Sequence, residues 1–438
     1  MDQNEALDIM KMGYNVYLTG EAGTGKTYVL NRYIKYLKEK RVAIGVTAST
    51  GIAATHLDGV TIDSWSGLGI RDYISQSDLI ELSHKWHLKR RLINAEILII
   101  DEISMMQGHR FDAIDEILKY LRNNSLPFGG LQVILSGDLF QLPPVSFDKQ
   151  NIDYIFKAKA WTELDLRICY LQEPMRQKDR QFLGMLYDIR HNKVDEATFE
   201  LLSDTMHQEA SDSITMTKLY THNIDVDAIN QRELDKIGGE SHFYDMSAVG
   251  AEKLTAMMKK TCLAPGRLEL KKGALVMFVR NNYELGYVNG TLGSVVGFNG
   301  NGDPIIETFA KQKITVAVAS WTITEDDKII AQITQVPLRL AWAITVHKSQ
   351  GMTLDAAEID LSKSFVEGMG YVALSRVKSL SGLRLLGINE MALRVSPEVA
   401  EIDKELIEIS KDTAENLKKM GIIKKVMKQR KFMYRLTS

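Results

Sequence analysis

The first half of the chain alternates short apolar runs with longer amphipathic stretches. Apolar runs precede polar or glycine-bearing turns at residues 14–19, 42–46, 96–100 and 132–135. Such runs are typical of buried parallel strands. Between them, residues 28–40 and 110–122 carry apolar side chains at helical spacing. We therefore expect a doubly wound α/β domain over residues 1–165, with functional side chains at the carboxyl ends of its strands.

The second half repeats this pattern and interrupts it. A second α/β domain is expected over residues 166–265 and 335–395. Between its two parts, residues 266–334 are punctuated by glycines and rich in β-forming side chains. This change of pattern predicts a small sheet or barrel inserted into the second domain.

The last part of the chain, residues 396–438, is predicted to be helical. Eight basic residues and no acidic one lie between Lys418 and Arg435. Such a run is typical of a solvated helix face, and a DNA-binding surface is the alternative interpretation. The overall charge weakens the DNA-binding interpretation, because 54 basic and 56 acidic residues give a net charge of -2. That balance excludes a broadly basic nucleic-acid coat, and any polyanion must be met by local contacts.

Composition otherwise describes a globular protein of two or three domains, with 438 residues, 45% of them hydrophobic and 25% charged. Two distant cysteines, Cys169 and Cys262, exclude a disulfide framework and a tetrahedral thiolate metal site. The first ten residues lack the basic start and apolar core of an export signal, and no run is long enough to span a membrane. We expect a cytoplasmic protein, nucleoid-associated if bacterial, with no membrane partner.

A glycine-rich segment follows a predicted strand and opens a predicted helix; it reads Gly20-Glu21-Ala22-Gly23-Thr24-Gly25-Lys26-Thr27. This is the context that a phosphate-binding loop requires. Glycines let backbone amides turn toward an anion at a helix N-terminus, Lys26 reaches the β- and γ-phosphates, and the Thr27 hydroxyl binds Mg²⁺. The alternative, a glycine-rich turn, leaves the Lys-Thr pair unexplained. The sequence therefore predicts a site for ATP and Mg²⁺.

Two carboxylates, Asp101 and Glu102, come directly after an apolar run. We expect Asp101 to hold the Mg²⁺ shell and Glu102 to polarise the attacking water, because the metal alone does not orient an in-line nucleophile. An Asp-Glu pair after a strand is also common as a helix N-cap, so the assignment depends on the phosphate loop upstream. Gln141 follows the next strand, and we expect it to contact the γ-phosphate or the attacking water; a surface turn is the alternative.

Two arginines, Arg176 and Arg376, fall at the edges of the second predicted α/β domain. An arginine offered across a domain cleft can neutralise the charge on the transferring phosphoryl group, which makes hydrolysis depend on closure. Taken alone, either arginine is more often part of a surface ion pair.

Polar side chains near several strand ends have the spacing that contacts to a nucleic-acid backbone need. They are Thr47, Ser49, Thr50, Gly51, Ser64 and Trp65 in the first domain, and His347, Lys348 and Ser349 in the second. Trp65 could stack on a base, and a core position fits its sequence context equally well. We expect these residues to contact a nucleic acid.

Taken in order, these segments resemble the motifs of the PIF (petite integration frequency) family of superfamily-one DNA helicases. Residues 127–132, preceded by Arg122 and leading into residues 137–145, resemble the stretch that marks this family. Residues 343–353 and 371–376 resemble two further family motifs, and the resemblance extends to about Leu393.

The resemblance implies two RecA-like P-loop NTPase domains, an SH3-like insertion at 266–334 and a short wedge insertion at 67–86. It also implies that Gln3, Gly351 and Tyr371 bind the nucleotide, with Gln3 recognising adenine. Pro144 and Val145 would contact DNA by the same argument.

One departure from the family pattern is Asp63, followed by Trp65, where the family usually has histidine and phenylalanine. An aspartate beside phosphates would be repelled, so we expect Asp63 to point away from the DNA.

The function that the resemblance implies is ATP-driven 5′-to-3′ translocation on single-stranded DNA, with unwinding of duplex or G-quadruplex DNA in replication, repair, recombination or telomere-type maintenance. We expect a monomer, with replication or repair proteins as candidate partners. Two alternatives are a phosphotransferase on a small acceptor, whose ATPase would be indifferent to DNA, and a nucleotide-regulated DNA-binding protein, which would lack an intact carboxylate pair and arginines.

Overall fold

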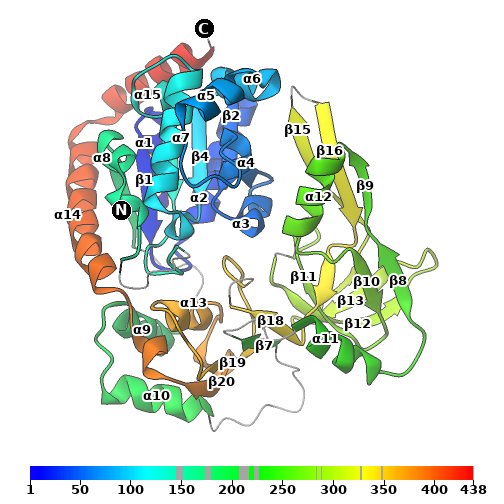
Figure 1. Ribbon diagram of the computed structural model, residues 1–438. Helices are drawn as coiled ribbons and strands as arrows, with labels where there is room; N and C mark the ends of the chain where they lie inside the picture. The colour runs from blue at the N-terminus through cyan, green and yellow to red at the C-terminus, as the bar shows by residue number, and fades with distance from the viewer. Residues whose placement is uncertain are drawn as a thin grey trace. The chain divides into compact units, whose positions relative to one another are not determined.

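The computed structural model describes residues 1–144, 151–172, 179–206, 217–220, 226–282, 284–287, 289–325, 328–346 and 349–437. The chain divides into two compact units (Figure 1). Unit 1 comprises Met1–Arg176 and Ser396–Ser438, and unit 2 comprises Gln177–Val395. Across the helices described, we find none with the length and apolar character that a membrane span requires.

Unit 1 is built on one parallel sheet. Its strands are β1 (Val16–Gly20), β2 (Ile44–Ala48), β3 (Val60–Thr61), β4 (Ile97–Asp101), β5 (Gln132–Ser136) and β6 (Arg167–Leu171). They lie in the order β3-β2-β4-β5-β1-β6. Every residue of β1, β4 and β5 is buried, as unbroken apolar runs require of strands covered on both faces. The prediction of a parallel α/β domain is confirmed.

Helices cover both faces of this sheet. They are α1 (Gln3–Lys11), α2 (Lys26–Glu39), α3 (Gly51–His56), α4 (Ile62–Ser66), α5 (Gln76–Ser83), α6 (Trp86–Asn94), α7 (Gly108–Leu121), α8 (Lys159–Glu163), α14 (Pro397–Lys419) and α15 (Ile422–Thr437), with 3-10 turns η1 (Ile103–Met105), η2 (Pro127–Gly130) and η3 (Ile155–Lys157). Val16 and Leu18 of β1 belong to the core that α1 and α2 cover. Tyr17 meets Trp161 of α8, with ring centroids 5.1 Å apart, because successive strand residues face opposite sides.

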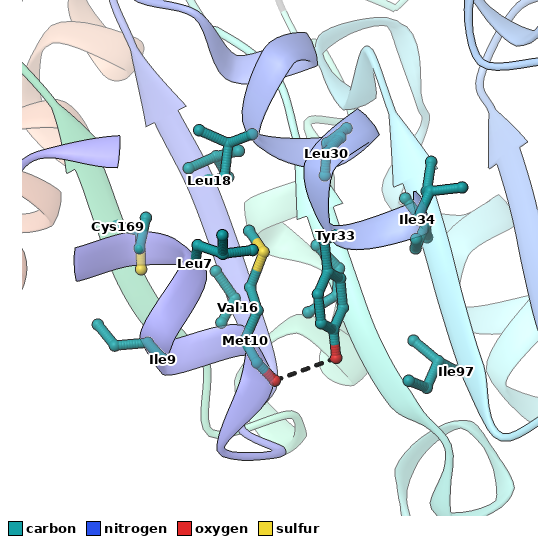
Figure 2. Close-up of a cluster of buried hydrophobic side chains, with 14 of the residues drawn as sticks. Leu7, Ile9, Met10, Val16, Leu18, Leu30, Tyr33, Ile34, Ile97 and Cys169 are labelled. Carbon is teal, nitrogen blue, oxygen red and sulfur yellow. Dashed lines mark hydrogen bonds between the residues drawn. The ribbon is translucent and has the colours of Figure 1, made fainter. Parts of the chain in front are cut away.

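A buried hydrogen-bond network fixes α1 and α2 against the sheet, and Figure 2 shows one of its bonds, between Tyr33 and Met10. The Tyr33 hydroxyl lies 3.1 Å from the Met10 carbonyl and 2.8 Å from Oε1 of Gln132. The Gln132 amide donates to the same carbonyl at 2.8 Å. Burial raises the pKa of Tyr33, so the phenol stays a neutral donor. The network gives every one of these core polar groups a partner.

Residues 127–130, in the stretch that resembles the family's signature, form a hydrogen-bonded turn before β5. Phe128 and Gly129 both have positive φ, 51° and 60°. The Phe128 amide donates to the Asp115 carboxylate at 2.6 Å, and the Arg122 guanidinium donates to the Gly129 carbonyl at 2.8 Å. The same guanidinium donates to carbonyls at the end of α6, including that of Ala95 at 2.7 Å. These bonds fix the turn that leads into β5.

The C-terminal helices complete unit 1. Helix α14 covers the edge strand β6, where the Tyr170 amide donates to the Ser410 hydroxyl at 3.0 Å. Helix α15 inserts Phe432 beside Gly13, where a Cβ would lie 2.3 Å from the ring. Pro397–Lys419 and Ile422–Thr437 are helical, as predicted, and Leu417 and Phe432 on them belong to the core of unit 1.

The predicted boundary between residues 165 and 166 is wrong. Strand β6 pairs in parallel with β1, with Val16 opposite Arg167. It is therefore the edge strand of the first sheet, and unit 1 extends to Arg176.

Unit 2 contains a second parallel sheet, in the order β18-β7-β19-β20. Its elements are β7 (Thr217–Tyr220), β18 (Ala343–Thr345), β19 (Ala357–Leu361), β20 (Leu383–Ile388), α9 (Arg180–Arg190), α10 (Glu196–Met206), α11 (Val226–Asp235), α13 (Met369–Leu374), η4 (Leu380–Gly382) and η5 (Glu390–Leu393). The prediction of a second α/β domain interrupted by a β-rich insertion is confirmed.

The insertion is larger than residues 266–334. It comprises β8 (His242–Asp245), β9 (Ser247–Gly250), α12 (Glu252–Thr261), β10 (Arg267–Leu270), β11 (Leu275–Phe278), β12 (Leu292–Phe298), β13 (Pro304–Thr308), β14 (Lys313–Thr315), β15 (Ala319–Glu325), β16 (Lys328–Gln335) and β17 (Leu338–Leu340). The sheets have the orders β14-β13-β12-β11-β17, β15-β16-β9 and β10-β8. The boundaries at 266 and 334 are wrong because β8 and β9 pair with later strands, while β17 pairs with β11. The SH3-like description stays a prediction.

Candidate nucleotide site

The segment from Gly20 to Thr27 forms a tight loop between β1 and α2. Gly20, Gly23 and Gly25 have φ values of 139°, 87° and 88°, which side chains rarely adopt. A Cβ on Gly20 would lie 2.4 Å from the Leu171 carbonyl, so the loop also needs glycine for close packing. The loop ends at the first turn of α2, where backbone amides and the helix dipole favour an anion.

Lys26 closes this loop on itself. Its ammonium donates to the Gly20 carbonyl at 2.8 Å and to the Glu21 carbonyl at 3.0 Å. The Thr24 hydroxyl also donates to the Glu21 carbonyl at 2.9 Å, while Thr27, the next residue of α2, is exposed. The loop is thus built in a shape that can surround phosphates, as predicted, and Thr27 is open to a ligand.

Asp101 and Glu102 lie at the carboxyl end of β4, at the same edge of the sheet as the loop. Asp101 is buried, and burial raises the pKa of its carboxyl against the opposing charge of Lys26 and the hydrogen bond from the Glu102 amide, 2.9 Å long. A cation beside Asp101 would favour the ionised form. The donor set therefore suits a divalent metal held by Asp101, Thr27 and phosphate oxygens.

Glu102 has an unusual backbone conformation, with φ 53° and ψ 49°. Its amide is fixed by Asp101, and its carbonyl accepts a hydrogen bond from the Ser49 hydroxyl of the neighbouring strand end. A left-handed conformation costs a residue with a side chain roughly 1–2 kcal/mol. Such conformations cluster at active sites, and this one supports the choice of Glu102 as a functional residue.

Gln3 lies against the phosphate loop. Its side-chain amide donates to the Thr24 carbonyl at 3.0 Å, and a Cβ on Gly25 would lie 2.3 Å from the same nitrogen. The structure thus brings Gln3 to the loop from α1, while its contact with adenine stays a prediction. Gln141 and Pro144, which follow β5, are both buried. The backbone N–H of Gln141 donates to the Asp138 carbonyl at 3.0 Å.

Two predicted DNA contacts in unit 1, Thr47 and Trp65, are buried. Thr47 is buried, and its hydroxyl donates to the Ile99 carbonyl of β4 at 2.7 Å. Trp65 is 4% exposed, and its ring packs on β2, where a Cβ on Gly45 would lie 2.5 Å from it. Both side chains are engaged inside unit 1, and a role for either in DNA binding stays a prediction.

The other DNA-contact candidates of unit 1 lie at the surface or at strand ends. The Thr50 hydroxyl caps the short helix α3, accepting from Ala53 at 3.2 Å, and Gly51 opens that helix. Ser64 is half-buried in α4, and its carbonyl accepts a hydrogen bond from Arg91 at 3.0 Å. Their role in DNA binding stays a prediction.

Asp63 is neutralised by an arginine that the sequence did not single out. Arg110 donates to Asp63 at 2.8 Å, to the Gly69 carbonyl at 2.9 Å and to the Arg71 carbonyl at 2.6 Å. The Asp63 carboxylate therefore forms an ion pair with Arg110, which agrees with the expectation that it does not face phosphates. No sequence signal could have found Arg110, since two of its four acceptors are distant backbone carbonyls and the other two are carboxylates far from it in the chain.

In unit 2, Arg376 and Tyr371 both lie on α13 or directly after it and are both buried. The Arg376 guanidinium donates to the Val372 carbonyl and to the Ser375 hydroxyl, both at 2.8 Å. The Tyr371 hydroxyl accepts from Arg190, a buried arginine of α9 that sequence reasoning missed, at 3.2 Å. Tyr371 is therefore a buried residue of unit 2, and its contact with the nucleotide stays a prediction.

Ser349 is also buried, and its hydroxyl donates to the Val346 carbonyl at 2.8 Å; its contact with DNA stays a prediction. Gly351 is exposed, with φ 76°. Val145, Arg176, His347 and Lys348 lie outside the described residues.

Comparison with known proteins places this site in a family. The family model described as "PIF1-like helicase" matches residues 2–198, and the model "DNA helicase Pif1, 2B domain" matches residues 253–298. A relative from a Psychrobacter species, named ATP-dependent DNA helicase Pif1, is 43% identical over 94% of this chain and 71% of its own length. The chain belongs to the PIF1-like helicase family.

Because the relatives are ATP-dependent DNA helicases, membership of this family excludes the alternative of a small-molecule phosphotransferase. The chain spans between 61% and 63% of the vertebrate relatives that it matches. Among solved structures, Pif1 of a Bacteroides species in complex with ADP-AlF4 is 32% identical, with TM-score 0.80, over 93% of this chain and 96% of that one. The same protein bound to single-stranded DNA gives TM-score 0.64 over 94% and 97%. The two parallel sheets are therefore those of two RecA-like domains.

Proposed function

We propose that this chain uses ATP and Mg²⁺ to translocate 5′ to 3′ on single-stranded DNA and unwinds duplex and G-quadruplex DNA. The observation that supports it most is the meeting of Lys26, Asp101 and Glu102 at one edge of the unit 1 sheet, in a member of a DNA helicase family. The ADP-AlF4 and single-stranded DNA complexes of the Bacteroides relative support ATP and DNA as ligands.

Each residue at this edge has a distinct chemical task. The loop amides and Lys26 bind the phosphates, so Lys26 exchanges its two carbonyl acceptors for phosphate oxygens. Thr27 and Asp101 would hold Mg²⁺, which when bound neutralises charge on the β- and γ-oxygens. Glu102 accepts the proton of the attacking water, because its backbone is fixed by Asp101 and Ser49 while its side chain is only half-buried.

Three further groups act on the transferring phosphoryl group in this proposal. Gln141 orients the water or senses the γ-phosphate, and Arg176 and Arg376 neutralise the charge that spreads over the phosphoryl oxygens. Arg376 is preorganised for this task by its hydrogen bonds to Val372 and Ser375, which fix the guanidinium along its own helix.

The proposed DNA contacts omit Thr47, Trp65 and Ser349, whose side chains are buried, and include Pro144 although it is also buried. They comprise Ser49, Thr50, Gly51, Ser64, Pro144, Val145, His347 and Lys348. Hydroxyls, amides and a few cations suit a motor that must release DNA in every cycle, because each permanent phosphate neutralisation adds a large salt-dependent term to affinity. We place the activity in DNA replication, repair or recombination, carried out by a monomer in the cytoplasm.

Strand separation on four substrates tests this proposal. Duplexes with a 5′ tail, a 3′ tail or a fork, and a 5′-tailed G-quadruplex, are mixed with enzyme, ATP and Mg²⁺. We expect opening of the 5′-tailed, forked and quadruplex substrates only, and loss of all opening when EDTA removes the metal. Opening confined to the 3′-tailed duplex would contradict the polarity, and no opening of any substrate would contradict the unwinding activity.

A further inference from the structure

The loop between α4 and α5, residues 67–75, presents apolar side chains on unit 1. Ile70 is 99% exposed and Tyr73 is 73% exposed, while Leu68 between them and α4 is fully buried. Gly67 and Gly69 have positive φ values of 85° and 64°, so the backbone turns sharply on either side of Leu68. The loop thus has one buried anchor and an apolar tip.

An isoleucine at full exposure gains nothing from folding, and a single one needs no explanation by itself. What distinguishes this loop is the number of hydrogen bonds that restrain it. Arg71 donates to Asp78 of α5 at 3.1 Å and to the Leu68 carbonyl at 3.3 Å, and the Gly69 amide donates to the Asp63 carbonyl at 3.0 Å. Flexible surface loops lack such bonds.

Arg110 is the centre of this network. From the first turn of α7 it donates to the carbonyls of Gly69 and Arg71, to Asp72 at 3.0 Å and to Asp63 at 2.8 Å. Its side chain is 16% exposed, against 30% for Asp63, so the pair is partly shielded from solvent and from salt. A planar guanidinium can serve several acceptors in fixed directions, which a lysine ammonium cannot do in the same way.

His109, next to Arg110, holds the other end of the loop. Its ring stacks on Tyr73 with centroids 4.9 Å apart and an angle of 27° between the planes. Its Nδ1 lies 2.5 Å from the Asp153 carboxylate, which also accepts from the His109 amide at 3.0 Å. Two consecutive residues of one helix therefore restrain the loop on both sides of Ile70.

The start of α7 is also close in the chain to the nucleotide site. Glu102 is followed by the 3-10 turn Ile103–Met105 and then by α7, whose first turn carries His109 and Arg110. Ile103, Met106 and Phe111 are buried, so the connection is anchored in the core at three points. Glu102 and Arg110 are thus joined by one 3-10 turn and the first turn of α7, the connection by which a change at one residue could reach the other.

We propose that Arg110, paired with Asp63, is a positioning residue that orients the loop with Ile70 at its tip for strand separation and couples it to the ATP site. This inference rests on the proposed function. Arg110 touches neither nucleotide nor scissile bond, so its loss uncouples unwinding from ATP turnover and leaves turnover itself intact.

The first test compares Arg110→Ala and Arg110→Lys with Lys119→Ala. Lys119 is the matched control, because it lies on the same helix and its partners, Asp115 and Glu163, are outside the loop. Unwinding and DNA-stimulated ATP turnover are measured on the tailed duplex that the parent chain opens, after thermal melting shows that each variant is folded.

We expect Arg110→Ala to lower base pairs opened per ATP about tenfold, with turnover within about twofold of the parent. Arg110→Lys should fall in between, since it keeps the charge opposite Asp63 and loses the fork of donors. Lys119→Ala should keep the parent ratio. Parallel loss of unwinding and turnover in Arg110→Ala, or an unchanged ratio, would overturn the inference while the parent's own unwinding leaves the proposed function standing.

The second test reads the loop directly. A nitroxide is attached to Ile70→Cys in a Cys262→Ser background, Cys169 being buried. The label should show slow, restricted motion in this background and fast motion when Arg110→Ala is added. Identical spectra in the two proteins would show that Arg110 does not position the loop and would overturn the inference.

Discussion

Trp65 offers a sharp test of the difference between a core residue and a base-stacking residue. It is 4% exposed, and an indole buried to this degree removes about 150–250 Å² from water. Replacement of a buried tryptophan or phenylalanine by alanine typically lowers the free energy of unfolding by about 3–5 kcal/mol. We therefore expect Trp65→Ala to destabilise unit 1 by that amount and to leave the DNA affinity of folded molecules unchanged.

Gly45 extends this prediction to a double-mutant cycle. Its Cβ position lies 2.5 Å from the Trp65 ring, so Gly45→Ala alone overpacks the interface and should cost about 1–3 kcal/mol. In the Trp65→Ala background the methyl group enters the space that the indole leaves. The two changes together should cost less than their sum by about 1–3 kcal/mol.

The assay is urea unfolding followed by circular dichroism, with single-stranded DNA affinity measured by anisotropy at one fixed salt concentration. Trp86→Ala is the matched control, because Trp86 is 59% exposed and should cost under about 1 kcal/mol. A base-stacking role would give the opposite result. Unchanged stability of Trp65→Ala with DNA affinity lowered about 5- to 150-fold would refute the core assignment.

Three further predictions concern stability and thiol chemistry. Burial raises the pKa of Cys262 to about 11 and also raises the pKa of Cys169. Labelling of Cys262 by a disulfide reagent should therefore accelerate about tenfold per pH unit from 7 to 10, while Cys169 should react only on unfolding. Fast labelling of both cysteines at pH 7 would contradict this prediction. Arg122→Ala should lower the unfolding free energy by about 1–3 kcal/mol, because it leaves carbonyls at the end of α6 and in η2 without their donor, whereas an unchanged urea midpoint would show that water replaces it. Phe432→Ala should lower it by about 3–5 kcal/mol by opening the contact of α15 with Gly13; a loss under about 1 kcal/mol would mean that α15 adds little to the core.

The parallel strands of unit 1 and the phosphate loop could be predicted from the sequence, because their signals are local. Unbroken apolar runs identify strands covered on both faces, and glycines at fixed spacing before Lys26 identify the loop. Membership of β6 in a sheet is not local. The run Arg167–Leu171 looks like any buried strand, and only its pairing with β1 assigns it to unit 1.

The candidate DNA contacts also depend on non-local packing that the sequence does not show. Thr47 and Trp65 are polar or amphipathic residues beside strand ends, which a chain uses equally for ligands and for internal bonds. Their burial depends on Ile99 and Gly45, residues that carry no functional signal of their own. Arg110 was missed for the converse reason, since two of its partners are carbonyls, which any residue supplies, and its two carboxylate partners lie far from it in the chain.

The central claim is that Glu102, fixed at the end of β4 by Asp101 and Ser49, is the base for DNA-stimulated ATP hydrolysis. Glu102→Gln keeps the size of the side chain and removes its basicity, and Glu116→Gln on the exposed face of α7 is the matched control. We predict that Glu102→Gln lowers ATP turnover on single-stranded DNA by at least about 10²-fold, with nucleotide and DNA affinities within about twofold of the parent and the control unchanged. Undiminished turnover in Glu102→Gln would contradict the account.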